Sequence, residues 1–267
     1  MSATSDIITS PANEQVKYVR TLHRRRNRYR ERKFIAEGLR TVEEAILAGT
    51  QPALLFHTPA VQHMPRVYSI LSQAEEQGTS IKAVSEPVMQ LIADTVTPSG
   101  ILAVLPMREC ALPSPLTWVL VIDSLRDPGN LGTILRSALA AGTELVITSK
   151  GTVDVYSPKV VRAAMGAHFH LNLCVHQNWS AIKRILSGVR VLVAKPGEGV
   201  PYWKVDWRQP TALVIGGEAE GTSPEAERLA SSSVTIPMHK GIESLNAAVA
   251  ASVLLFEAAR QRFHPDL

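Results

Sequence analysis

A short segment in the middle of the chain places polar side chains directly after an apolar run. Residues 118–123, WVLVID, have the continuous apolar character of a buried strand, and the turn RDPGN follows at 126–130. We expect a helix after this turn, and it carries Arg136 among apolar neighbours. The planar guanidinium of an arginine suits phosphate. Structural interpretations also stay open, since Asn130 could cap the helix and Arg136 could form an ion pair or extend into solvent.

Glycine-rich turns follow two later strand-like segments. They read IGGEAEG at 215–221 and HKGIESLN at 239–246. Neither the G-x-G-x-x-G fingerprint of dinucleotide-binding proteins nor a phosphate-binding G-x-x-x-x-G-K-[ST] loop occurs in the sequence. Turns at the carboxyl ends of neighbouring parallel strands are where ligands bind in such sheets. Each turn could be only a tight connection, but their polar side chains favour a ligand site.

Strands and helices alternate along both halves of the sequence. In the first half we expect a basic helix at 10–33, a helix ending at Gly49, helices at 66–77 and 87–93, and strands at 81–84 and 101–106. In the second half we expect strands at 118–123, 144–149, 170–175, 190–195, 212–217 and 234–238, and a last helix at 244–262. This order predicts an α/β protein with a mostly parallel sheet in its second half. A proline-rich linker at 109–116 is expected to separate domains at 1–108 and 117–267.

The segment between Lys17 and Lys33 has one sign of charge. It holds nine Lys or Arg in seventeen residues, and Glu31 is its one acid. A solvated helix face is the structural alternative, but such a segment repels itself unless a polyanion neutralises it. We therefore predict contact with nucleic acid. The residues expected to bind it are Arg24, Arg25, Arg26, Arg28, Arg30, Arg32 and Lys33.

The composition fits a folded globular protein of 267 residues, with 45% hydrophobic and 19% charged residues. The amino-terminal residues lack the pattern of a secretory signal, and the longest apolar stretch, near 247–256, is too short to span a membrane. We expect a cytoplasmic protein without a membrane partner. Cys110 and Cys174 lie far apart in the sequence and are expected to be two reduced thiols. No metal-ligand spacing occurs, so no metal site is predicted.

Three motifs in the second half resemble the signatures of the TrmH/SpoU family of RNA methyltransferases, which belong to the SPOUT class. They are NLGTILR at 130–136, VIGGEAEG at 214–221, and IPM with SLNAAVA within 236–250. The third motif often reads SLNVSV, and here two alanines replace its middle pair. FIAEGLRTVEEA at 34–45 and TPSGILAV at 97–104 are similar to the domain that precedes many such enzymes. The resemblance implies a SPOUT α/β knot, a trefoil-knotted parallel sheet, after a smaller ribosomal-protein-like α/β RNA-binding domain.

The same resemblance implies methyl transfer from S-adenosyl-L-methionine to a ribose 2'-hydroxyl. It assigns Arg136 as the catalytic arginine, proposed to bind the neighbouring phosphate and to assist deprotonation. Arginine stays protonated at its ordinary pKa, so we favour the phosphate role. Asn130 would order Arg136, and Glu218 would fix Arg136 or nearby backbone groups. Asn246 would lie near the methyl donor, and Ser244 would both cap the last helix and belong to the site.

The cofactor's adenosine is expected to contact mainly backbone groups of the second and third motifs. Among them, Gly216 would allow the ligand to approach the strand end closely. The expected cofactor-binding residues are Gly216, Gly217, Gly221, Ile236, Met238, Leu245 and Asn246.

The leading hypothesis is an rRNA ribose 2'-O-methyltransferase, acting on large-subunit rRNA as a homodimer formed by the C-terminal domain. The two-domain form and the basic segment favour a large structured RNA. The same reaction on tRNA is the first alternative. A non-catalytic knotted RNA-binding protein is the second, although Arg136, Glu218 and Asn246 are all present. A nucleotide-dependent oxidoreductase is the third, and the missing glycine fingerprint weighs against it.

Overall fold

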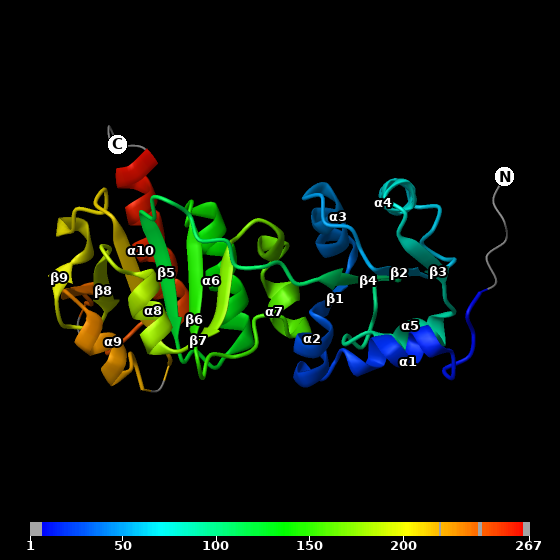
Figure 1. Ribbon diagram of the computed structural model, residues 1–267, viewed down its shortest axis with the longest axis horizontal. Coiled ribbons are helices and arrows are strands. Elements are labelled where there is room, and N and C mark those ends of the chain that lie inside the picture. The colour runs from blue at the N-terminus through cyan, green and yellow to red at the C-terminus, as the bar shows by residue number, and fades with distance from the viewer. Residues whose placement is uncertain (1–6, 219, 240–241, 264–267) are drawn as a thin grey trace. The chain divides into compact units, whose positions relative to one another are not determined.

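The computed structural model of the chain contains two compact units (Figure 1). It describes residues 7–218, 220–239 and 242–263. Met1–Arg108 together with Tyr156–Phe169 make the first unit, and Glu109–Val155 together with His170–Leu267 make the second. The segment Tyr156–Phe169 thus packs within the first unit, whereas we had placed it in the C-terminal domain. The domain limits at 1–108 and 117–267 stay a prediction.

The first unit is built around a four-stranded sheet in the order β1-β4-β2-β3. The strand β4 is antiparallel to both of its neighbours, and β2 is parallel to β3. Apolar side chains of α1 and α5, among them Val19 and Met89, bury one face of the sheet. The elements are α1 (Glu14–Thr21), α2 (Arg25–Glu31), β1 (Lys33–Glu37), α3 (Leu39–Leu47), β2 (Leu54–His57), α4 (Pro65–Glu76), β3 (Ser80–Ala83), α5 (Glu86–Ile92), β4 (Ile101–Pro106), α7 (Pro158–Ala163) and the 3-10 turn η1 (Ala167–Phe169).

The basic segment forms two short helices, so the prediction of one helix over 10–33 is wrong. The side chain of Asn13 caps α1, and Arg32 ends α2 in the left-handed conformation with φ 51°. Arg28 is only 3% exposed, and its guanidinium donates to the carbonyl oxygens of Leu22 at 2.7 Å and His23 at 2.8 Å. Those carbonyls lie where α1 ends, and the charged hydrogen bonds satisfy them. Arg28 therefore stabilises the corner between the helices, and its assignment to RNA contact is wrong.

The other predicted RNA-binding residues lie at the surface of this unit. Lys33 is half-buried at the start of β1, and the remaining side chains are exposed: Arg24, Arg25, Arg26, Arg30 and Arg32. Their contact with RNA stays a prediction.

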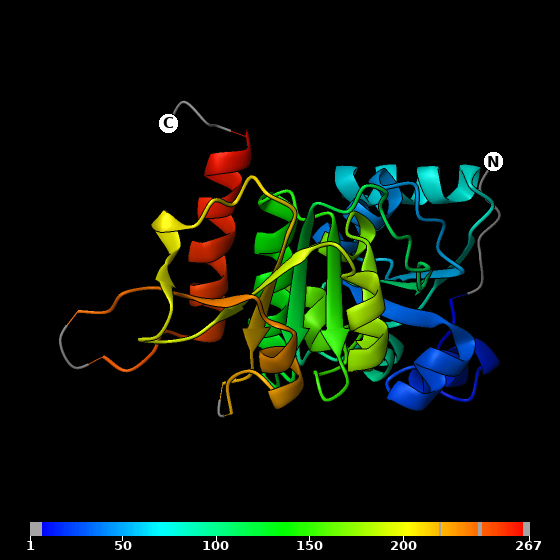
Figure 2. The same ribbon diagram turned by 60° about the vertical axis from the view of Figure 1, so that its left-hand side comes forward.

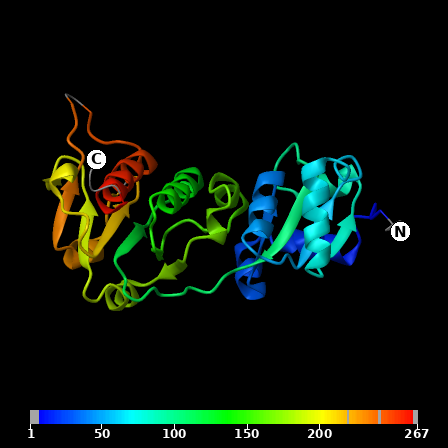
Figure 3. The same cartoon turned by 90° about the horizontal axis from the view of Figure 1, so that it is seen from above.

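The second unit contains a seven-stranded sheet in the order β7-β6-β5-β10-β8-β11-β9, and every pair in it is parallel. The helices α6 and α10 lie on one face, and α8 and α9 lie on the other (Figures 1 and 3). The elements are β5 (Trp118–Asp123), α6 (Pro128–Ala140), β6 (Leu145–Ser149), β7 (Leu173–Gln177), α8 (Trp179–Ile185), β8 (Arg190–Ala194), β9 (Val200–Pro201), the 3-10 turn η2 (Tyr202–Lys204), β10 (Thr211–Gly216), α9 (Pro224–Leu229), β11 (Ser232–Thr235) and α10 (Ala247–Phe263).

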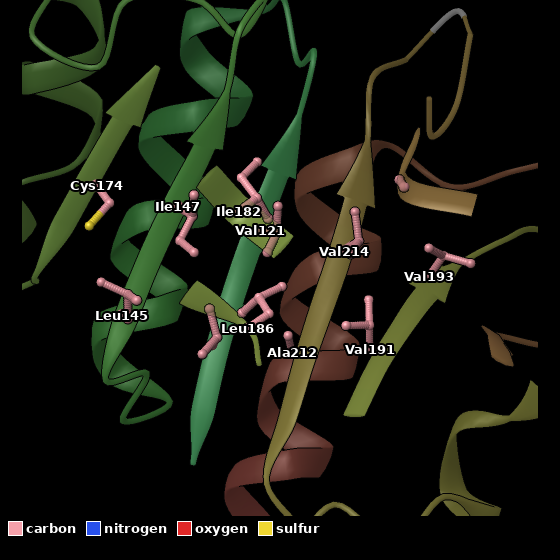
Figure 4. Close-up of a cluster of buried hydrophobic side chains, with 12 residues drawn as sticks. Val121, Leu145, Ile147, Cys174, Ile182, Leu186, Val191, Val193, Ala212 and Val214 are labelled. Carbon is pink, nitrogen blue, oxygen red and sulfur yellow. The ribbon is translucent and has the colours of Figure 1, made fainter. Parts of the chain in front are cut away.

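The central strands are apolar on both faces because helices cover both. β5 is buried along its whole length, and β10 is buried from Thr211 to Ile215. Side chains from the five neighbouring strands β7, β6, β5, β10 and β8 meet those of α8 and α9 in one cluster (Figure 4), which includes Val121, Ile147, Ile182 and Val214. Continuous β-branched and apolar runs are what a doubly covered parallel sheet requires. The predicted α/β class, with a parallel sheet in the second half and a smaller first unit, is confirmed.

The two cysteines are paired, so the prediction of two separate thiols is wrong in this structure. Cys110 and Cys174 form a disulfide, with their Cα atoms 5.0 Å apart. Sixty-four positions separate them in the sequence, and spacing alone does not reveal a contact of this kind. None of the described helices is long and apolar enough to cross a membrane.

Replacing Ile147 with alanine should lower the free energy of unfolding by about 2–5 kcal/mol, because the side chain is fully buried in the cluster of Figure 4. Ile147→Val removes one methylene and should cost about 0.5–1.5 kcal/mol. Urea titration of the three proteins measures both values. A loss for Ile147→Ala no larger than that for Ile147→Val would contradict the packing described here.

Candidate functional site

The polar segments after β5 and β10 lie next to each other because the two strands are neighbours in register. Asp123, the last residue of β5, is paired with Gly216, the last residue of β10. Pro128 is the first residue of α6, and the side chain of Asp127 caps that helix by accepting the backbone N–H of Asn130 at 2.7 Å. Asn130 is therefore in the first turn of α6 and is not its cap. Its own side chain remains available for other contacts.

A chain of hydrogen bonds joins one residue from each of the three motifs. The Nδ2 of Asn246 donates to the Oδ1 of Asn130 at 3.0 Å, and the Nδ2 of Asn130 donates to the Oε1 of Glu218 at 2.8 Å. The other oxygen of Glu218 accepts the backbone N–H of Arg126 at 3.3 Å. We call Asn246, Asn130 and Glu218 the amide–carboxylate chain. It fixes the ends of β5, β10 and α10 with respect to one another.

Asn246 also begins the last helix. Its Oδ1 accepts the backbone N–H groups of Ala248 at 2.9 Å and Val249 at 3.3 Å, which is the geometry of an N-cap. The helix α10 starts at Ala247, so the prediction that Ser244 caps it is wrong. One side chain thus satisfies the helix end with its oxygen and contacts Asn130 with its nitrogen.

Two glycines of the second motif lie where no side chain fits. A Cβ atom on Gly216 would clash with the backbone of Gly221, and one on Gly217 would come within 2.7 Å of the carbonyl oxygen of Ser124. Gly217 and Gly221 exchange two backbone hydrogen bonds, at 3.0 and 3.1 Å, which close the turn. The pattern of glycines therefore follows from close backbone approach and not only from turn conformation.

The buried carboxylate of Asp123 holds the neighbouring connections in place. It accepts the hydroxyl of Ser149 at 2.8 Å and the backbone N–H of Ser223 at 2.7 Å. Ser124 follows in the left-handed region with φ 56°, and its N–H is bonded to the hydroxyls of Ser149 and Thr152. Such a conformation costs energy in a residue other than glycine and persists where the surroundings determine it.

Two cavities open beside the amide–carboxylate chain, and both are lined by Gly217, Glu218, Gly221 and Asn246. The first has a volume of about 740 Å³, and its other lining residues are Ser124, Arg126, Asp127, Pro128, Asn130 and Glu220. The second has a volume of about 510 Å³, and it brings together all seven predicted cofactor-binding residues: Gly216, Gly217, Gly221, Ile236, Met238, Leu245 and Asn246.

The second cavity has a lining that fits an adenosine-containing cofactor. Apolar side chains such as Ile215, Val234 and Leu254 could contact a purine ring, and the bare backbone of Gly216 leaves room at the strand end. Lys195 adds a charged group to this lining, and its ammonium is paired with Glu227 at 2.6 Å. Within the described residues, no group of three or more His, Cys, Asp or Glu side chains could hold a metal ion.

Arg136 is not brought to either cavity of its own chain. It follows Asn130 by six positions, which is not a whole number of helical turns, so the two side chains leave α6 in different directions. The side chain is exposed, and it forms no ion pair with Glu218 or Asp123 or any other described residue. We had expected Glu218 to fix Arg136 or nearby backbone groups. It contacts the side chain of Asn130 and the backbone N–H of Arg126, and it does not contact Arg136.

The electrostatics of Glu218 follow from its hydrogen bonds. Burial alone would raise the pKa of this carboxyl, but hydrogen bonds from the Asn130 side chain and from the backbone of Arg126 and Asp127 outweigh it. Its pKa lies below the ordinary value of 4.5, so Glu218 is an ionised acceptor at neutral pH.

Residues 117–256, more than half of the chain, match the SpoU rRNA Methylase family, and residues 13–103 match an MRM3-like substrate binding domain. The chain belongs to the SpoU rRNA methylase family.

Individual SpoU relatives cover nearly the whole chain. It is 33% identical to the 23S rRNA (guanosine(2553)-2'-O)-methyltransferase RlmP of Bacillus subtilis, over 93% of this chain and 97% of that protein. It is 34% identical to the mitochondrial rRNA methyltransferase 3A of Danio rerio, over 88% of this chain but only 65% of that protein. The AdoMet-bound rRNA methyltransferase from Sinorhizobium meliloti has a TM-score of 0.85 at 30% identity and covers 97% of this chain and 98% of its own.

Sequence reasoning missed several residues that line the cavities of this SpoU protein. Ser124, Arg126 and Asp127 precede the first motif and line the first cavity, and Lys195 lines the second. The turn RDPGN carried the signal for Arg126 and Asp127, because a charged pair directly after a strand of a parallel sheet lies at its ligand-binding edge. Lys195 follows β8 and had the same signal.

Replacing Asn130 with aspartate should destabilise the protein more at pH 8 than at pH 6. The new carboxylate would face Glu218, and like charges at this distance raise the pKa of one of them until it binds a proton. In the wild type the pKa of Glu218 is lower in the folded protein than in the unfolded chain. Its contribution to the free energy of unfolding is therefore complete above pH 4.5 and is lost only as the pH falls through the folded-state pKa. It should not change between pH 8 and 6.

Urea unfolding at both pH values measures this difference for the aspartate variant. The matched control is Asn130→Ala, which removes the same hydrogen bonds without adding a charge and should lose about 1 kcal/mol at either pH. Equal destabilisation of the aspartate variant at pH 8 and pH 6 would contradict the contact with Glu218.

Proposed function

We propose that this SpoU protein transfers a methyl group from S-adenosyl-L-methionine to a ribose 2'-hydroxyl of rRNA, most specifically of the large subunit. The observation that carries the proposal is the amide–carboxylate chain, which lies between two cavities that share four lining residues. One cavity suits an adenosine and the other is open enough for a nucleotide. A donor and an acceptor bound on its two sides would meet at Asn130 and Asn246.

The residues of the second and third motifs would hold the cofactor in the second cavity. Backbone groups at Gly216, Ile236 and Leu245 would contact the adenosine, while apolar side chains surround its base. When bound, S-adenosyl-L-methionine supplies a methyl group that its sulfonium already makes electrophilic. The protein then has to align the hydroxyl with this methyl group, and such alignment can contribute roughly 7–11 kcal/mol in the best cases.

Asn130 and Asn246 would position the ribose. In each of these two amides both the oxygen and the nitrogen are already hydrogen-bonded within the protein, so neither side chain can rotate without breaking a contact. Glu218 would keep this arrangement oriented as an ionised acceptor. Preorganised groups of this kind cost no rearrangement when the hydroxyl arrives.

Arg136 would act in the site of a second subunit. The helix α6 packs beside α10 (Figure 2), where the hydroxyls of Ser137 and Ser252 contact each other at 2.8 Å. Arg136 precedes Ser137, and its side chain is exposed. On α10 the side chains of Val249, Phe256 and Phe263 are 49%, 51% and 57% exposed and recur every seven residues. Repeated apolar side chains along one helix face favour a partner. We propose a homodimer through this face, with Arg136 of each chain binding a phosphate at the other site.

The first unit would bind the RNA around the target. Its exposed arginines and its match to an MRM3-like substrate binding domain support this role. RlmP of Bacillus subtilis is named for 23S rRNA, and the Danio rerio relative is named as an rRNA methyltransferase. These names favour rRNA over the tRNA alternative. We propose that the protein is located in the cytoplasm, where it would encounter its rRNA substrate.

Labelled S-adenosyl-L-methionine should transfer its methyl group to purified rRNA and not to tRNA. Nuclease digestion should recover the label as a 2'-O-methylnucleoside. Arg136→Ala and Asn246→Ala should each lower kcat/KM by about 10²–10³-fold, as expected when a positioned contact to the reacting groups is lost. Label in tRNA alone would favour the alternative substrate, and retention of activity by both variants would contradict the site.

Mixing two inactive variants tests the dimer. If Arg136 serves the partner's site, a heterodimer of Arg136→Ala and Asn130→Ala subunits has one site with both residues, and about half of the mixed-dimer sites should recover. Co-refolded or co-expressed variants should therefore regain activity. In separate size measurements, Phe256→Asp should shift the protein toward monomer. Restoration only when both residues are intact on one chain would contradict the proposed arrangement.

A further inference from the structure

The first cavity carries an excess of negative charge for a site that would receive RNA. Three carboxylates line it, those of Asp127, Glu218 and Glu220, and Arg126 is the one cation among the described lining residues. A nucleotide within a strand brings phosphate groups, and like charges repel. Entry of the strand therefore needs a cation that can turn toward it.

Two of these carboxylates are committed to the fold. Asp127 accepts the backbone N–H of Asn130 and caps α6, and Glu218 accepts the side chain of Asn130 and the backbone N–H of Arg126. Glu220 differs from both. It forms an ion pair with the guanidinium of Arg126 at 3.3 Å, and its side chain is 76% exposed.

The pair of Arg126 and Glu220 is suited to exchange. The arginine side chain is 71% exposed, and ion pairs between exposed groups contribute little to stability. A phosphate offers a guanidinium two parallel charged hydrogen bonds, which is a stronger contact than a single bond at 3.3 Å. The backbone of Arg126 is meanwhile held by Glu218, so the side chain can change partner while its Cα stays at the cavity.

We infer that Arg126 binds a backbone phosphate of the RNA strand that enters the first cavity, and that Glu220 holds Arg126 in the absence of RNA and competes with that phosphate. This inference rests on the proposed function, because it names a substrate contact for the same site. It differs from the role of Arg136, which lies outside this cavity. RNA binding therefore requires that the contact of the phosphate with Arg126 be stronger than the contact of the Glu220 carboxylate with Arg126.

The exchange predicts opposite effects for the two partners. Arg126→Gln should raise the KM for rRNA by about tenfold and lower the slope of log affinity against log salt by about one, as expected for one lost phosphate contact. Glu220→Gln should lower the KM for rRNA, because Arg126 no longer has a competing partner. In the Arg126→Gln background the Glu220→Gln change should lower the KM by less than it does in the wild type, because without Arg126 it removes only the direct repulsion between the carboxylate and the strand.

The matched control is Arg228→Gln, which removes another exposed arginine of the second unit, paired with Glu225 at 3.5 Å and outside both cavities. It should leave the KM for rRNA unchanged. Binding of S-adenosylhomocysteine, measured by calorimetry, should be the same in all variants. This readout separates a contact with RNA from a general disturbance of the motif.

Filter binding measures the affinity of each variant for the same rRNA independently of catalysis. A higher KM and weaker binding for Glu220→Gln would mean that the pair only supports the turn, and this would overturn the inference. Wild-type affinity in Arg126→Gln would overturn it as well. If the wild type does not methylate rRNA at all, the proposed function fails, whereas normal methylation with an unchanged Arg126→Gln variant contradicts only the exchange.

Discussion

The contact between Asn130 and Glu218 is the interaction on which the candidate site depends. It joins the segment after β5 to the segment after β10, and through Asn246 it extends to the start of α10. Without it, three turns that are far apart in the sequence would meet only through backbone packing. A carboxylate with a lowered pKa suits this position, because it stays an acceptor over the neutral range.

The parallel sheet is what makes this contact possible. Neighbouring strands of a parallel sheet end at the same edge, and here the last residues of β5 and β10 are paired directly. The glycines of the second motif then allow the turn to approach Ser124 more closely than any side chain would permit. The two cavities can therefore share one wall, formed by Gly217, Glu218, Gly221 and Asn246. The knot that the family resemblance implies would close this arrangement, and it remains a prediction.

Sequence patterns predicted the parts of the molecule that depend on local periodicity or on backbone geometry. The strand at Trp118–Asp123 was predicted to the residue because a doubly covered strand is apolar throughout. The expected cofactor residues all line one cavity, but they were expected from the family resemblance and not from periodicity. Close backbone approach explains only Gly216 and Gly217 among them. Contacts between distant side chains were not predictable in this way. In the sequence Arg28 looks like the other surface cations of its segment. In the structure its long side chain is buried because it reaches carbonyl oxygens at the end of α1. Asn246, and not Ser244, caps α10 because its side chain can accept a backbone N–H of the helix and donate to Asn130 at the same time.

The most direct test of this account is a crystal structure of the protein with S-adenosylhomocysteine bound. We expect the adenosine between Gly216, Ile236 and Leu245, with the sulfur directed toward Asn130 and Asn246 and the bond between Asn130 and Glu218 intact. Such a structure would place the methyl-donor position where the two cavities meet. Adenosine bound outside this cavity, or a sulfur directed away from the amide–carboxylate chain, would contradict the account.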